Sequence, residues 1–133
     1  MALHNPYQAY QNNSVNTASP GELTLMLYNG CIKFIHQAKM AINAKQIEAK
    51  NTNIQKAQKI IQELMVTLNM DLEVSKDMMS LYDYMNRRLI EANINNDTSI
   101  LDEVEELVSE FRDTWKQVIQ ANRQKQYVQG GSI

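Results

Sequence analysis

Residues 19–42 read SPGELTLMLYNGCIKFIHQAKMAI, and this stretch determines what kind of fold the chain can form. It begins with a helix start signal, because Ser19 can serve as the N-cap, Pro20 suits the first turn, and Glu22 completes a capping box. Apolar residues then recur at helical spacing and define one face. They are Leu23, Met26, Leu27, Cys31, Phe34, Ile35, Ala38 and Ile42. The stretch therefore predicts a long amphipathic helix.

Three further apolar residues of this stretch, Leu25, Tyr28 and Ile32, form a second stripe beside the first at their own i, i+3, i+7 spacing. Together the two stripes cover about two-thirds of the helix circumference, at roughly 100° per residue. A surface helix in a small bundle needs a narrower apolar stripe. The excess indicates either that neighbouring helices nearly surround this helix or that part of it binds a partner.

Composition limits the class of protein. The chain has 133 residues, of which 44% are hydrophobic and 21% charged, as expected of one globular domain. It contains only four glycines and two prolines, which favours long helices. A net charge of -2 argues against a nucleic-acid partner, because phosphate binding needs a basic patch.

The cysteine content and the lack of targeting or membrane-spanning patterns bear on the cellular location. The single cysteine, Cys31, cannot form an internal disulfide. We find neither a signal peptide nor an apolar run long enough to cross a bilayer. These features predict a cytoplasmic protein without direct membrane insertion.

The rest of the chain predicts three more helices. Similar apolar seams give an all-α fold, an antiparallel up-down four-helix bundle over residues 19–119, with helices at about 20–43, 47–69, 75–94 and 99–119. Ser75 is a candidate cap for the third helix, and Thr98 or Ser99 for the fourth. Residues 1–18 are predicted to be a flexible arm, and residues 120–133 a polar tail.

The arm carries the pattern Asn5-Pro6-Tyr7-Gln8-Ala9-Tyr10. A helical turn started by Pro6 would place Tyr7 and Tyr10 on the same side. The two tyrosines are either incidental residues of a flexible arm or an aromatic latch that docks in a groove.

Methionine supplies a further signal, since the chain has eight Met and only two Phe. Met65, Met79 and Ile90 lie beside or off the predicted core seams. Unbranched thioethers adapt to varied shapes, so Met-rich surfaces suit the binding of partner helices. Together with the second stripe of residues 19–42, they predict a bundle with apolar grooves for a helical partner.

No pattern predicts a metal, a cofactor or an enzyme. Neither histidine belongs to a Glu-x-x-His unit, and there is no glycine-rich phosphate loop. His36 with Lys39 has a trace of a phosphotransfer site, which leaves a histidine phosphotransfer bundle as one alternative. A structural bundle that self-associates through its apolar surface is the other.

Four motifs in order resemble the FliS family of flagellin-specific export chaperones. The first is Asn5-Pro6-Tyr7-x-x-Tyr10, and the second is Glu22-Leu23-x-x-Met26-Leu27-Tyr28-Asn29-Gly30. The third is Leu81-Tyr82-Asp83-Tyr84-Met85 with Arg88-Leu89 and Ala92-Asn93, and the fourth is Leu101-x-Glu103-Val104, reaching Arg112 and Trp115. The family usually has Tyr-Asp-Gly where this chain has Asn29, a conservative departure.

The resemblance implies a non-enzymatic cytoplasmic chaperone. It would bind the disordered C-terminal segment of flagellin in apolar grooves, prevent premature polymerisation and assist delivery to the cytoplasmic domain of the export gate. Tyr7 and Tyr10 would cover a groove or dock on the gate, and the chain would be a monomer or a weak dimer. The candidate binding residues are Tyr7, Tyr10, Leu25, Tyr28, Ile32, Met65, Met79 and Ile90.

Overall fold

The computed structural model describes residues 20–131, with side chains from Gly21 to Arg123. These residues form helices and turns only: α2 (Pro20–Asn43), α3 (Ile47–Val66), α4 (Glu73–Asn95) and α5 (Thr98–Gly131). The predicted all-α, four-helix antiparallel fold is confirmed for the described part of the chain. The predicted arm, with Tyr7 and Tyr10, lies outside the described residues.

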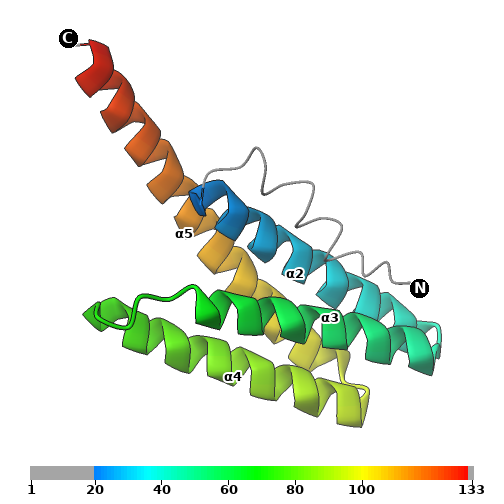
Figure 1. Ribbon diagram of the computed structural model, residues 1–133. Coiled ribbons are helices and arrows are strands. Elements are labelled where there is room, and N and C mark those ends of the chain that lie inside the picture. Colours follow the sequence, from blue (N-terminus) through cyan, green and yellow to red (C-terminus); the bar gives the residue numbers. More distant parts are fainter. Residues whose placement is uncertain (1–19, 132–133) are drawn as a thin grey trace, which may run out of the picture.

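The helices are arranged so that each packs mainly against two others. α2 packs against α3 and α5, and α4 packs against the same two helices. The order around the bundle is therefore α2, α3, α4, α5, with α2 and α4 on a diagonal. Figure 1 shows the last part of α5 projecting past the beginning of α2.

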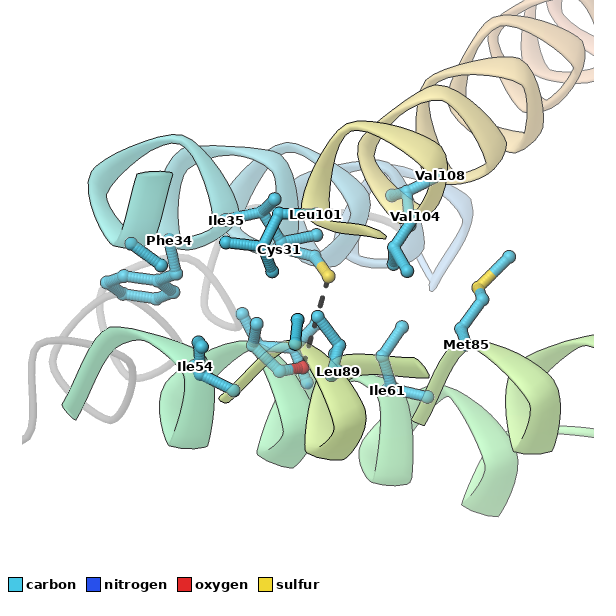
Figure 2. Close-up of a cluster of buried hydrophobic side chains, with 14 of the residues drawn as sticks. Cys31, Phe34, Ile35, Ile54, Ile61, Met85, Leu89, Leu101, Val104 and Val108 are labelled. Atoms are coloured by element: carbon cyan, nitrogen blue, oxygen red, sulfur yellow. Dashed lines mark hydrogen bonds between the residues drawn. The ribbon is translucent and has the colours of Figure 1, made fainter. Parts of the chain in front are cut away.

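The core joins the inward sides of all four helices. Figure 2 shows Cys31 and Ile35 of α2 on one side of the cluster and Ile54 and Ile61 of α3 on the other, with side chains of α4 and α5 completing it. Gly30 allows α2 and α3 to approach closely, because a Cβ there would lie 3.2 Å from Cδ1 of Ile60. Burial raises the pKa of the Cys31 thiol to about 12, which leaves it an inert core residue.

The helix starts differ from those expected. α4 begins at Glu73, with Leu72 in extended conformation as its N-cap and no side-chain cap bond, so Ser75 lies buried inside the helix. Asp97, and not Thr98 or Ser99, caps α5: one of its carboxylate oxygens accepts hydrogen bonds from the backbone N–H groups of Ser99 at 2.9 Å and Ile100 at 3.3 Å. The Ser99 hydroxyl first, and then these N–H groups, lower the pKa of Asp97.

Two helix ends also differ. α3 ends at Val66 and not at 69, which lengthens the connection to α4. α5 continues to Gly131, whereas the sequence suggested a polar tail from residue 120. That expectation rested on polarity, but Gln, Ala, Arg and Lys are good helix formers, and no glycine or proline occurs from residue 120 until Gly130.

Candidate functional site

The described side chains enclose a pocket at one end of the bundle, with a volume of about 650 Å³. It lies where α2 begins, α3 ends, α4 begins and α5 passes by. Its apolar lining includes Leu23, Leu68, Leu72, Val74, Met78 and Trp115. We call this the end pocket. Its size and apolar lining are typical of a site that accepts several hydrophobic side chains.

The α3–α4 connection keeps the mouth of the end pocket apolar. The Asn69 side chain accepts a hydrogen bond from the backbone N–H of Asp71 at 3.0 Å, which fixes a tight turn. Beyond this turn, Leu72 is 53% exposed and Val74 57% exposed, although both line the pocket. The bundle core does not use these side chains, so they are available to a partner.

Two tyrosines form part of the pocket wall. The Tyr28 hydroxyl of α2 lies 2.6 Å from the Tyr82 hydroxyl of α4, within hydrogen-bond distance. The Phe111 ring of α5 meets both rings edge-on, with centroids 6.3 Å and 5.7 Å away. Desolvation raises the pKa of both phenols. Tyr28 is only 2% exposed, so most of its side chain is packed in the pocket wall, and its role in partner binding stays a prediction.

The other wall is built where α5 holds the first turn of α2. The Trp115 indole N–H donates to the Gly21 carbonyl at 2.8 Å, and Arg123 forms an ion pair with Glu22. Leu25 lies beside these contacts, in a smaller groove of about 260 Å³ between α2 and α5, which we call the side groove. The predicted residue Leu25 therefore lies next to the end pocket and outside it.

The two candidate residues Leu25 and Ile32 lie on the side of α2 that faces α5. Lys39, seven residues after Ile32 and so on the same side of the helix, binds Asp102 at 2.7 Å and Glu105 at 2.8 Å. The hydrogen bonds that the Lys39 ammonium donates to these two carboxylates hold its pKa above the usual value. We call this side the α2/α5 face.

The remaining candidates lie on the other side of the bundle. The Gln58 side chain of α3 donates to the Asn86 side chain of α4 at 3.3 Å, which marks the α3/α4 face. By helical spacing, Met65 shares this side with Gln58, and Met79 and Ile90 share it with Asn86. The helices follow one another around the bundle in the order α2, α3, α4, α5, so the α2/α5 face and the α3/α4 face lie on opposite sides. No single groove therefore contains all the candidate residues.

Apart from Tyr28, the sequence did not single out the residues that make the end pocket. Residues 69–75, NMDLEVS, were interpreted as a turn, and Met78 and Trp115 as core. One signal was present in the sequence: Met70, Leu72 and Val74 are apolar residues in a turn, where no core explains them. In the structure these three are 46%, 53% and 57% exposed.

Residues 3–122 match the family described as "FliS: Flagellar protein FliS". The chain is 60% identical over 131 residues to the flagellar secretion chaperone FliS of Bacillus subtilis (strain 168), a match that covers 98% of each chain. The chain belongs to the FliS family.

More distant FliS relatives and a solved structure agree with this assignment. The flagellar secretion chaperone FliS of Salmonella typhimurium is 34% identical over 114 residues, covering 84% of each chain. A structure described as "Crystal structure of flagellar chaperone from bacteria" superposes with a TM-score of 0.72 at 19% identity, covering 87% of this chain and 96% of that one. At 19% identity this superposition supports the four-helix fold alone.

Membership of the FliS family makes this chain a non-enzymatic chaperone of flagellar secretion. His36 is exposed, with its Nδ1 at 4.0 Å from a Glu105 carboxylate oxygen, on the polar side of α2. Among the described residues, no cluster of His, Cys, Asp or Glu could hold a metal ion. No helix in the described range is long and apolar enough to span a membrane.

Proposed function

We propose that this FliS-family chain binds the disordered C-terminal segment of flagellin in the cytoplasm, keeps flagellin from polymerising early and helps deliver it to the export gate. The observation that carries the proposal is the end pocket, whose apolar lining extends to exposed side chains at its mouth. Each client side chain buried there contributes about 1.5–3 kcal/mol. Ordering a disordered client offsets part of that gain, so several anchors are needed.

The client would follow a path that includes both candidate faces. Leu25 adjoins the pocket-lining Thr24 in sequence, and Met79 adjoins the pocket-lining Met78. A segment that starts on the α2/α5 face would cross the end of the bundle at the end pocket and continue along the α3/α4 face. Such a wrapped path uses the surplus apolar residues on opposite sides of the bundle.

The arm has a role in the same proposal. It joins the bundle at Pro20, next to Gly21, which lines the end pocket. Tyr7 and Tyr10 would cover the pocket when flagellin is absent and dock on the cytoplasmic domain of the export gate when the client has displaced them. Tyrosine suits both roles, because it combines a large apolar ring with a polar end.

The test is a calorimetric titration of the full chain with a peptide that covers the C-terminal segment of flagellin, followed by circular dichroism. We expect saturable one-to-one binding and a gain in helicity, since a disordered client orders on the bundle. A peptide of the same composition in scrambled order is the control and should not bind. Absence of binding by the native peptide would leave the fold intact and refute the proposed client.

A further inference from the structure

Within the described side chains, the tyrosine pair at the end pocket has one more hydrogen-bond donor than it uses. Tyr28 and Tyr82 each carry one hydroxyl proton, and their oxygens lie 2.6 Å apart. One hydroxyl donates to the other, so the accepting hydroxyl still has a proton to donate. Among the side chains of residues 21–123, the structure gives these two hydroxyls no other hydrogen-bond partner.

The pair is held in place beside the pocket. Tyr28 is 2% exposed and Tyr82 is 1% exposed, yet both line the end pocket. Phe111 packs edge-on against both rings and offers no acceptor. Desolvation keeps the pKa of both phenols above the usual value, so both hydroxyls remain protonated at neutral pH.

We propose that Tyr28 and Tyr82 together donate one hydrogen bond to a free backbone carbonyl of the client segment, and so act as a specificity determinant inside an apolar pocket. This inference rests on the proposed function, because it names the chemistry that the flagellin segment must bring to the end pocket. Apolar anchors alone would then be insufficient for full-affinity binding of the client. A client that seats only hydrophobic side chains there would leave a buried donor without a partner, which is unfavourable.

Two features indicate a polypeptide as the occupant. The end pocket is lined by Gly21, Leu23 and Thr24, and the side groove by the interleaved residues Glu22 and Leu25 of the same helix turn. The two hollows lie on either side of the contact between α5 and the first turn of α2, so an elongated chain that passes over this contact would occupy both. The last turn of any client helix has backbone carbonyls without an intrahelical partner, and these are the acceptors that the pair would bind.

Three variants separate this role from simple bracing of α2 against α4. In Tyr28→Phe or Tyr82→Phe, one hydroxyl remains and can still donate to the client, so affinity should stay within about twofold of wild type. In Tyr28→Phe/Tyr82→Phe no donor remains, and affinity should fall about threefold to tenfold. Peptide affinity is measured by the calorimetric titration described above, and thermal stability by circular dichroism.

The melting temperatures of these variants should follow a different order from their peptide affinities. Each single variant leaves one buried hydroxyl without a partner, whereas the double variant replaces both partners by apolar rings of similar shape. The single variants should therefore melt at lower temperature than the double variant. Tyr84→Phe is the matched control, since the Tyr84 hydroxyl donates to Glu103 at 2.8 Å on the α4/α5 side, away from the pocket.

The possible outcomes are distinguishable. If the single variants bind more weakly than the double variant, affinity follows stability and the pair only braces the fold, which overturns the inference. If the double variant melts at the lowest temperature, the second hydroxyl proton already has an acceptor within this chain. The client is then not needed as the acceptor, and the inference is overturned. If wild type itself does not bind the peptide, the proposed function fails before any variant is compared.

Discussion

Leu72 occupies a helix-capping position, where a polar residue is usually found. It is the N-cap of α4 and makes no side-chain cap bond, although Asp, Asn or Ser would satisfy a free N–H group there. Its side chain is instead 53% exposed and lines the end pocket. An apolar residue at a cap position is explained if the side chain serves a partner and not the stability of the helix.

The variant Leu72→Asp should therefore change stability and binding in opposite directions. A new cap should raise the free energy of unfolding by about 0.5–2 kcal/mol. Loss of an apolar anchor and gain of a charge should weaken binding of the flagellin peptide about tenfold or more. Thermal melting and calorimetric titration of the same preparation measure both effects.

Met40→Asp is the control for this experiment, because Met40 is 59% exposed on the last turn of α2, at the opposite end of the bundle. It should leave peptide affinity unchanged. Equal loss of affinity in both variants would mean that charge alone weakens binding and that Leu72 is not an anchor.

Single residues were the least predictable part of the structure. Lys50 is 4% exposed, and its ammonium group donates to the Asn93 carbonyl at 2.9 Å and to the Asn96 side chain. A lysine in a polar segment is normally assigned to the surface. Only the position of the end of α4 beside α3 makes this burial favourable, and sequence periodicity does not contain that information.

At the scale of the helices, α4 has exposed apolar residues on two different sides. Ile90 is 43% exposed and shares the α3/α4 face with Asn86. Leu81 is 39% exposed and, by helical spacing, lies on the same side as Arg88, which binds Glu103 of α5 at 2.8 Å. Similar exposure on two sides of one helix allows a matched comparison.

If the client continues along the α3/α4 face, Ile90→Asp should weaken peptide binding several-fold, by removing an anchor worth about 1.5–3 kcal/mol when fully buried. Leu81→Asp should bind as wild type does. Affinity is measured by titration, after melting curves have shown that both variants are folded. The reverse result would move the client to the side of α4 that faces α5.

The helices themselves were predictable, whereas their ends and the site were less so. Apolar residues at helical spacing, such as Ile54 and Ile61 in α3, report burial directly, and both lie in the core. The pocket depends on how four helix segments meet, so residues such as Trp115 gain a functional position only from the packing. Ile32 and Met65 likewise lie on opposite sides of the bundle because of the order of the helices around it. A helical wheel of one helix does not give that order.

For the molecule as a whole, the contact between α5 and the first turn of α2 has an optical consequence. Trp115, whose indole donates to the Gly21 carbonyl, is the only tryptophan in the chain, and it lines the end pocket. An apolar client that displaces water from the pocket should shift its fluorescence emission to shorter wavelength. The binding of unlabelled flagellin could then be followed through Trp115, and Trp115→Phe should abolish the signal.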